Sequence, residues 1–183
     1  QIQVVDFQEA AIIAKADEYL SQVPEPITDF SCQRSEGGIH DFYSEGDYWW
    51  PDPDNPDGPY IRRDGNSNPH NFNAHRLAMV NVNRWVAALV AAYKITGEEK
   101  YAAHAREHLY SFFLNPATRM NPSLLYAQAI KGRVSGRGIG LIDTIHLIDV
   151  AKAISVLIKL DYLSESDAKG LRKWFEDFAT WMN

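Results

Sequence analysis

The sequence predicts an all-α protein in which helical hairpins are arranged in a ring, an (α/α) toroid. Three observations support this fold class. Apolar residues recur at helical spacing over long stretches, and no segment longer than a few residues alternates with the period of a strand. Stretches that are apolar on nearly all sides also alternate along the chain with stretches that are apolar on one side only. Such hairpins produce this order of buried and outer helices, so we expect the long loops to gather at one end of the ring.

The first predicted helix covers residues 6–23, where apolar residues recur at helical spacing. Pro24 and Pro26 end it, because proline cannot continue the hydrogen bonding of a helix. A long loop follows over residues 25–73 and shows no apolar period of its own. Loops this long in compact domains are usually functional or disordered, and the aromatic residues of this one favour function.

The next two predicted helices form a hairpin. Residues 74–96 are apolar around most of the helix circumference, which indicates a buried helix, and Asn73 can cap its start. Gly97 lies where glycine commonly ends a helix. Residues 98–114 are apolar along one stripe and charged along the other, as expected of an outer helix.

A second loop and a second hairpin follow. The loop covers residues 115–140 and is rich in glycine and proline. Residues 141–160 are again apolar nearly all round and predict a buried helix. The last helix begins at about residue 165, after Ser164, whose hydroxyl can form a capping box with Asp167.

Two hairpins and an opening helix would leave the sides of a ring uncovered. The apolar pattern of the last helix also runs to Trp181 and Met182 without a glycine or proline that would end it. We therefore expect residues 1–183 to form the amino-terminal part of a single toroidal domain.

Composition and charge limit the classes of partner. A chain of 183 residues, 45% of them hydrophobic, suffices for one domain or part of a larger one. Its net charge of −6 would repel nucleic acid and anionic membranes, and no apolar run approaches the roughly 20 residues of a membrane span. The single cysteine, Cys32, excludes an internal disulfide. The first residue is Gln1 rather than methionine; removal of an export signal would explain this, so we expect a secreted or periplasmic protein.

Residues 37–76 carry most of the side chains that could bind a ligand. This stretch mixes flat aromatic rings with cationic and hydrogen-bonding groups, which suits a ligand made of rings, hydroxyl groups and negative charge. We therefore interpret it as one wall of a site for an acidic sugar polymer. The candidate substrate-binding residues of the two loops are Tyr43, Trp49, Trp50, Arg62, His70, Arg76, Arg133 and Arg137.

Convergent arginines would hold the carboxylates of a uronate chain, because guanidinium binds carboxylate through paired hydrogen bonds. Arg137 is the strongest candidate, since the glycines around it allow a ligand to approach the start of a helix closely. We expect Asp143 to form an ion pair that positions Arg137. The alternative for Arg62 is solvation, or pairing with a nearby aspartate such as Asp64.

The adjacent Trp49 and Trp50 are expected to divide their roles, one stacking on a sugar ring and the other anchoring the loop. The pattern does not identify the base of a reaction. His75 and Tyr43 are the candidates for catalysis, because histidine and tyrosine side chains can carry a proton. A purely structural role is the alternative for His75, as for the other histidines of this loop.

Other chemistries receive less support. The aspartates of residues 52–57 alternate with prolines, which is typical of turns and does not match an EF-hand calcium loop. His70 and His75 lack partners at zinc-ligand spacing, and the glycines of residues 136–140 do not follow a strand as they would in a phosphate-binding loop. We therefore expect neither a metal nor a cofactor. A glycoside hydrolase would need a carboxylate pair, for which the candidates are Asp41, Glu45, Asp47, Asp143 and Asp149.

Three segments resemble the alginate lyase domain family of polysaccharide lyases, which has an (α/α) toroid: YSEGDYWWPDP, NPHNFNAHR and SGRGIGLIDTIHLIDVAKAI. The resemblance covers nearly the whole chain from Gly37 onward. It implies cleavage of a uronate polymer, such as alginate or a glucuronan-like chain, by β-elimination. In that reaction arginine and asparagine neutralise the carboxylate, a tyrosine or histidine removes the C5 proton, and a tyrosine protonates the leaving oxygen.

The family's Asn-Asn-His motif, and a later arginine and tyrosine, lie downstream of a helix like that of residues 165–183 and have no counterpart in this sequence. The resemblance carries over to a substrate-binding wall, formed by Tyr43, Trp49, Trp50 and Arg137. We expect the chain to be inactive by itself, or active only together with a missing carboxy-terminal half of the domain. A noncatalytic module that binds acidic glycans and a toroidal glycoside hydrolase are the alternative functions.

Overall fold

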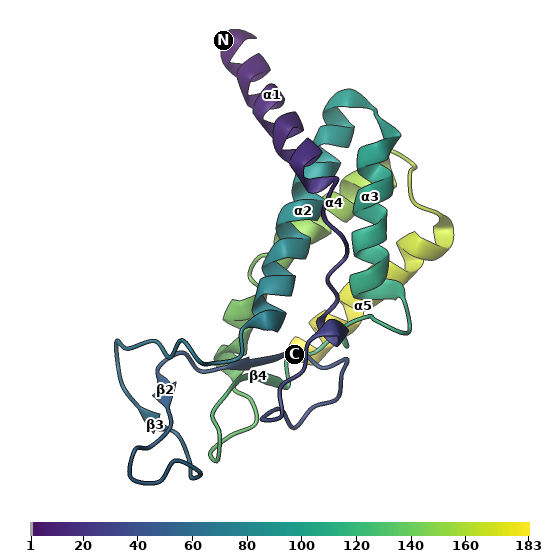
Figure 1. Ribbon diagram of the computed structural model, residues 1–183. Coiled ribbons are helices and arrows are strands. Elements are labelled where there is room, and N and C mark those ends of the chain that lie inside the picture. Colours follow the sequence, from purple (N-terminus) through teal and green to yellow (C-terminus); the bar gives the residue numbers. More distant parts are fainter. Residues whose placement is uncertain (1) are drawn as a thin grey trace.

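The computed structural model describes residues 2–183, with side chains from Phe7 onward. Helices form a bundle, and loops and short strands gather at one end of it (Figure 1). The helices are α1 (Ile2–Tyr19), α2 (Ala74–Thr96), α3 (Glu99–Leu109), α4 (Leu147–Lys159) and α5 (Glu165–Met182), with the shorter turns η1 (Ile27–Asp29), η2 (Tyr110–Leu114) and η3 (Gly138–Thr144). The strands are β1 (Tyr43–Glu45), β2 (Trp49–Trp50), β3 (Ile61–Arg62) and β4 (Tyr126–Ala129).

Helix α2 lies at the centre of the bundle and packs against α1, α3 and α4. Met79, Val86 and Leu89 along it are completely buried, as predicted for a helix that is apolar nearly all round. Its bounds agree with the predicted residues 74–96. Gly97 ends the helix in the left-handed conformation, with φ of 71°, and its N–H donates to the carbonyl of Tyr93.

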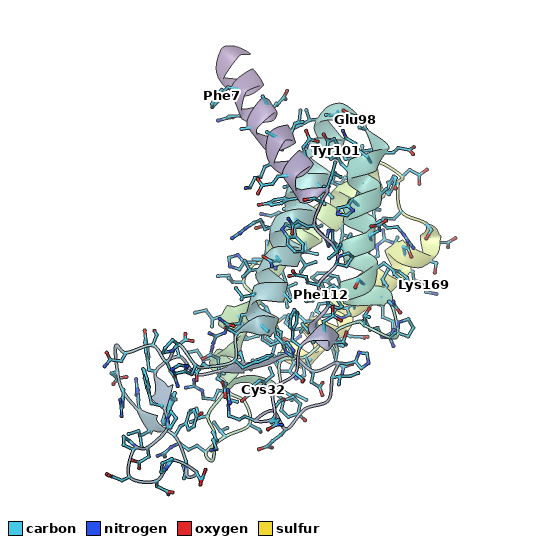
Figure 2. All side chains as sticks on the ribbon, in the orientation of Figure 1. Phe7, Cys32, Glu98, Tyr101, Phe112 and Lys169 are labelled. Carbon is cyan, nitrogen blue, oxygen red and sulfur yellow. The ribbon has the colours of Figure 1, made fainter. Side chains whose placement is uncertain are left out.

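Residues of η2, which follows α3, and of α5 complete the core of the bundle. Phe112 lies inside the bundle, whereas Cys32 lies at the loop end (Figure 2). Trp174 of α5 packs edge-to-face against Phe113, with ring centroids 4.8 Å apart. The serine half of the predicted capping box of α5 is confirmed, because the hydroxyl of Ser164 accepts a hydrogen bond from the backbone N–H of Asp167. The carboxylate of Asp167 instead accepts a hydrogen bond from Arg106 at 2.8 Å.

The predicted helix over residues 141–160 needs correction. Helix α4 begins at Leu147, and η3 occupies the preceding residues in the tighter 3₁₀ geometry. Gly140 lies in close contact with β4, because a β-carbon there would lie 2.5 Å from the side chain of Ala127. The glycine therefore lets η3 rest directly on β4.

The fold is mostly α-helical, as predicted, and it also contains two small sheets that were not predicted. Strands β1 and β4 pair in parallel, and β2 and β3 pair antiparallel. They are too short to show a strand period in the sequence. The arrangement of the hairpins as a ring stays a prediction. None of the helices in the described part of the chain is long and apolar enough to cross a membrane.

Candidate functional site

The two long loops meet at the loop end of the bundle. The parallel pairing of β1 and β4 joins Tyr43 to Tyr126 and Glu45 to Ala129, so residues more than 80 positions apart become neighbours. Further backbone hydrogen bonds extend this seam, including one from the N–H of Gly46 to the carbonyl of Ala129. The seam brings the first aromatic loop against the arginines of the second.

Trp49 lies near two arginines of the second loop. The guanidinium of Arg133 stacks on its ring, with 5.3 Å from Cζ to the ring centroid. A β-carbon at Gly46 would lie 2.7 Å from Nη2 of Arg137 and 2.7 Å from Cδ1 of Trp49. Both side chains therefore rest on the same glycine. A half-buried ring thus has two cationic groups near it.

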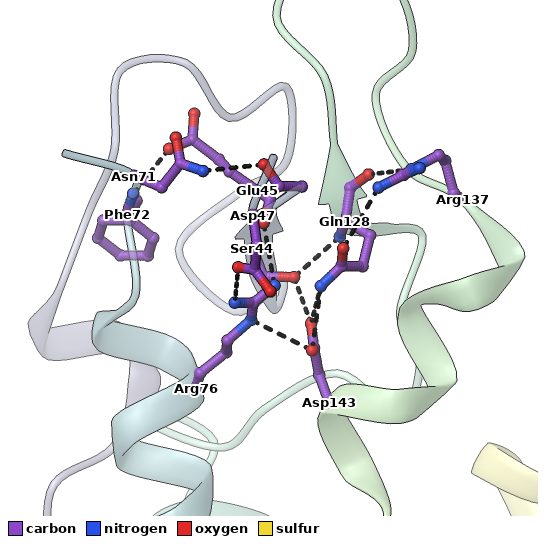
Figure 3. Close-up of polar contacts among 10 residues, drawn as sticks. Ser44, Glu45, Asp47, Asn71, Phe72, Arg76, Gln128, Arg137 and Asp143 are labelled. Atoms are coloured by element: carbon purple, nitrogen blue, oxygen red, sulfur yellow. Dashed lines mark hydrogen bonds and ion pairs between the residues drawn. The ribbon is translucent and has the colours of Figure 1, made fainter. Parts of the chain in front are cut away.

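Arg137 is held by neutral acceptors (Figure 3). Its Nε donates to the carbonyl oxygen of Gln128 at 2.7 Å, and its Nη2 donates to Oε1 of the same residue at 3.3 Å. Among the described residues, no carboxylate lies within ion-pair distance of it. Burial and the charge of Arg62 lower the pKa of Arg137, while Asp47 opposes them. The positive charge of this side chain is therefore not compensated at close range.

Arg133 is held in a similar way. Its Nε donates to the carbonyl oxygen of Tyr60 at 2.6 Å, and its side chain is exposed. Within the described part of the chain it also has no carboxylate partner. It lines one side of a cleft of about 580 Å³, together with Lys131 and Arg34, and Tyr43 contributes to the same cleft. Two arginines near Trp49 thus have no carboxylate partner among the described residues, although the chain as a whole is acidic.

Arg76 and Arg62, by contrast, are paired with carboxylates. Arg76 donates to Asp47 at 2.6 Å and to the carbonyl of Glu45 at 2.9 Å. Its Nε also lies 3.1 Å from Oδ1 of Asp143, an ion-pair distance at an angle that does not make a hydrogen bond. Arg62 is exposed and lies 2.5 Å from Asp64, which is the alternative that the sequence left open.

The expected ion pair between Asp143 and Arg137 is wrong. Asp143 instead pairs with Arg76 and accepts hydrogen bonds from the hydroxyl of Ser44 and the side-chain amide of Gln128. The reason is local: Arg137 is in extended conformation just before η3, and its side chain turns to Gln128, whereas Asp143 lies inside η3 and faces β1. Gln128 occupies the space between the two charged groups (Figure 3).

A buried carboxylate, Glu45, organises the floor beneath these groups. It accepts two hydrogen bonds from Arg34, at 2.5 and 2.8 Å, one from the hydroxyl of Tyr43 and one from the N–H of Phe72. Burial alone would raise the pKa of Glu45, but the donors from Arg34 and Phe72 hold it below its usual value. Burial and the neighbouring Glu45 raise the pKa of Tyr43, so this phenol keeps its proton.

The two catalytic candidates are both engaged in structural contacts. His75 is 4% exposed; its Nδ1 accepts from the N–H of Tyr43 at 2.9 Å, and its Nε2 lies 3.0 Å from the carbonyl of Phe30. These partners specify the neutral tautomer protonated at Nε2, and burial lowers the pKa of His75. Tyr43 is 2% exposed. The geometry favours the structural role for His75 and leaves neither residue with a free basic atom toward the cleft.

The remaining candidates lie in the first loop. Trp50 donates from Nε1 to the carbonyl of Asn66 at 2.8 Å, and Arg63 stacks on its ring, so it anchors the loop. His70 is exposed at a turn that its backbone N–H forms with Asn68. Among the described residues, no group of three or more histidine, cysteine or acidic side chains could hold a metal ion.

Several residues that build the site were not among the predicted ones. Gln128 and Ser44 connect the two loops, and Asn71 donates to the carbonyl of Gly46 at 2.9 Å. The only sequence signal for Gln128 is a polar residue inside the otherwise apolar run from Tyr126 to Ile130. A buried polar residue needs partners, and such an interruption could have marked it.

Comparison with known proteins places the chain in a family. The family model described as alginate lyase matches residues 27–183. No curated protein matches the chain significantly. A crystal structure of an alginate lyase from Bacteroides ovatus is similar at 36% sequence identity and a TM-score of 0.86, over 95% of this chain and 47% of that one. The chain thus spans about half the length of this solved structure. The match over most of its residues shows that the chain belongs to the alginate lyase family.

Proposed function

We propose that this chain forms the substrate-binding wall of a polysaccharide lyase that cleaves a uronate-containing polymer, alginate or a glucuronan-like chain, by β-elimination. One observation carries this proposal. Arg133 and Arg137, neither paired with a carboxylate within the described residues, lie near the half-buried ring of Trp49. A uronate chain presents a flat pyranose face beside a carboxylate, so an aromatic ring close to two available guanidinium groups matches its repeating unit.

The arrangement also fits the chemistry of elimination. A base removes the proton from C5, the C4–O bond breaks, a C4–C5 double bond forms, and the leaving oxygen takes up a proton. The proton at C5 is scarcely acidic beside an ionised carboxylate, so a guanidinium that pairs with this carboxylate stabilises the charge that develops. In this proposal Arg137 has that role and Trp49 positions the ring.

The groups that transfer protons are proposed to come from the remainder of the domain. Tyr43 and His75 have their polar atoms engaged in the floor of the site, and the similar alginate lyase structure is about twice as long as this chain. An acidic polysaccharide of this kind is met outside the cytoplasm, so we also propose a secreted or periplasmic protein.

An apolar face supports further helices as the partner of this chain. Ile142, Ile145 and Ile148 are about 60% exposed, at 62, 61 and 59%. They lie beside a groove of about 340 Å³ between η3, α4 and α5 that also includes Met182. Exposed apolar patches commonly mark interaction sites. We propose that the remaining helices of the same toroidal domain cover this face.

The alternative functions are weighed by the same geometry. A glycoside hydrolase needs a free pair of carboxyl groups, but Glu45, Asp47 and Asp143 are each paired with an arginine. A noncatalytic module that binds acidic glycans stays compatible with the cationic face.

Incubation with alginate and with a glucuronan tests the proposal. The chain is assayed by itself and mixed with the carboxy-terminal half of the Bacteroides ovatus enzyme. We expect ultraviolet absorbance of an unsaturated product only when both halves are present, and binding without cleavage by the chain itself. An increase in reducing ends without that absorbance would indicate hydrolysis. Binding that never leads to cleavage, even with the second half, would indicate a binding module.

A double variant distinguishes the apolar face from the sugar-binding face. Ile145→Glu with Ile148→Glu is expected to abolish association with the second half, measured by size-exclusion chromatography, and to leave binding of the polymer unchanged. Lys169→Glu, an exposed position on α5, is the matched control and is expected to leave both unchanged. Association that survives the double variant would contradict the proposed partner.

A further inference from the structure

Gln128 stands out in β4 because of its backbone. Its φ is 57°, in the left-handed region that a residue with a β-carbon rarely adopts, and its side chain is 7% exposed. The only other residue of the described chain with such a conformation, apart from glycines, is Asp161 at the end of α4. Non-glycine residues persist in this conformation where the surrounding contacts hold them, and such positions cluster at functional sites.

The contacts that hold Gln128 connect both loops to Arg137. Its backbone N–H donates to the hydroxyl of Ser44 at 2.8 Å, and its side-chain amide nitrogen lies 3.2 Å from Oδ1 of Asp143. Its carbonyl and side-chain oxygens both accept from Arg137. Figure 3 shows Gln128 between the carboxylate of Asp143 and the guanidinium of Arg137. One side chain therefore donates to an anion and accepts from a cation.

A glutamine suits this position because its amide is neutral. A glutamate of the same shape would repel Asp143 and would compensate the charge of Arg137. An asparagine is one methylene shorter, so it would not span the two groups. Glutamine fixes the direction of the guanidinium and leaves its charge available.

We propose that Gln128 is a positioning residue that aims Arg137 at a substrate carboxylate without neutralising it. This inference rests on the proposed function, in which Arg137 binds that carboxylate. Asp143, the nearest acid, is kept away from Arg137 because Arg76, Ser44 and Gln128 occupy it.

The test measures the affinity of the 183-residue chain for an alginate oligosaccharide by calorimetry. Arg137→Ala is expected to lower affinity about tenfold, the loss of one charge-assisted contact. Gln128→Asn keeps an amide and tolerates the left-handed backbone, but its shorter side chain does not reach from Asp143 to Arg137. It is expected to lower affinity roughly fivefold, and to have no further effect when combined with Arg137→Ala.

The dependence of affinity on salt separates positioning from a general loss of structure. Gln128→Glu is expected to reduce the salt dependence as Arg137→Ala does, because the new carboxylate pairs with Arg137. Gln128→Asn is expected to leave the salt dependence unchanged, because the charge of Arg137 remains. Melting temperatures check folding, and Gln128→Gly, which accepts the backbone conformation without strain, replaces any variant that does not fold.

The outcomes separate this inference from the proposed function. Normal binding by the Gln128 variants, with weak binding by Arg137→Ala, would overturn the positioning role and leave the proposed function in place. An equal loss from Gln128→Asn with and without Arg137 would also overturn it, because Gln128 would then act independently of Arg137. Undiminished binding by Arg137→Ala, or no binding by the native chain, would overturn both.

Discussion

The loop end of the molecule contains two regions that use arginine in opposite ways. In the floor, Arg34 and Arg76 lie against the carboxylates of Glu45, Asp47 and Asp143. In the wall around Trp49, Arg133 and Arg137 are held by carbonyl and amide oxygens, and no carboxylate pairs with them among the described residues. The arginines of the floor are paired with carboxylates, and those of the wall are the ones that we propose to bind a ligand.

The difference shows why composition is a poor guide to binding. The chain carries a net charge of −6, yet Arg133 and Arg137 have no carboxylate partner among the described residues. Burying an ion requires a partner, and the floor supplies one for each of its charges. Which arginines remain without a carboxylate partner therefore depends on where the acidic residues lie, and not on how many acidic residues the chain has.

The largest expected effect is on the floor. Glu45→Ala removes a carboxylate that is 3% exposed and accepts from Arg34, Tyr43 and Phe72, so it leaves buried donors without partners. We expect the free energy of unfolding to fall by about 3 kcal/mol, as measured by urea denaturation. Asp64→Ala, which removes the partner of the exposed Arg62, is the control and should cost at most about 0.5 kcal/mol. Equal losses would remove the distinction between floor and surface.

The helical core offers a second test, at the buried His108, whose Nε2 has no hydrogen-bond partner among the described residues. Burial, with a smaller effect of His104, lowers the pKa of His108 from 6.5 to about 4. The neutral form is therefore favoured in the folded state, so stability is full above pH 6.5 and is lost as the pH falls toward 4. At about 1.4 kcal/mol per pH unit, this loss amounts to roughly 3 kcal/mol.

Urea denaturation at pH 7.5 and pH 4.5 measures this effect, with His108→Phe as the comparison. The variant is expected to lose much less stability between the two pH values than the native chain, because it no longer takes up a proton on unfolding. The same acid sensitivity in both proteins would show that the floor carboxylates, and not His108, determine it.

In the wall, Trp49 and Trp50 are expected to differ. Trp49→Ala should lower the affinity for an alginate oligosaccharide about tenfold, because it removes the aromatic ring that lies near Arg133 and Arg137. Trp50→Ala should change affinity less than about threefold, since its ring is covered by Arg63 and its Nε1 is bound to Asn66. Calorimetry measures both affinities. A larger loss from Trp50→Ala would show that Trp50, and not Trp49, stacks on the sugar.

The smallest effects separate paired from unpaired arginines. Arg133→Ala is expected to lower affinity about fivefold, whereas Arg62→Ala should change it less than about twofold, because Asp64 already compensates that exposed charge. Affinity measurements at low and moderate salt check this. If Arg62→Ala weakens binding more than Arg133→Ala does, pairing in the free protein is not what selects the arginines that bind.

Much of the helical architecture could be predicted because its signals are local. The apolar period of α2, the glycine after it and the serine cap of α5 each depend on residues within one or two turns. The strands could not be predicted in this way, since β1 and β4 contain three and four residues and are paired across the whole first hairpin.

The candidate site was predicted by residue type but not by pairing. The proximity of Trp49 to Arg137 follows the expected meeting of two loops, whereas the partner of Asp143 does not. Sequence spacing suggested Arg137, six positions before Asp143, as the ion-pair partner of Asp143. The backbone before η3 directs Arg137 elsewhere, and Arg76 of α2 is the partner instead. Side-chain partners of this kind depend on the direction of loops, which no local pattern encodes.

The parallel pairing of β1 with β4 also has a consequence for the order of folding. Parallel strands need a long crossover, and here the crossover contains α2, α3 and η2. Contacts between residues so distant in sequence form slowly, because the entropy of closing the intervening chain must be overcome first. We therefore expect the hairpin of α2 and α3 to fold early and the contact between the two long loops to form last. A bound oligosaccharide would then slow unfolding of the loops more than unfolding of the helices.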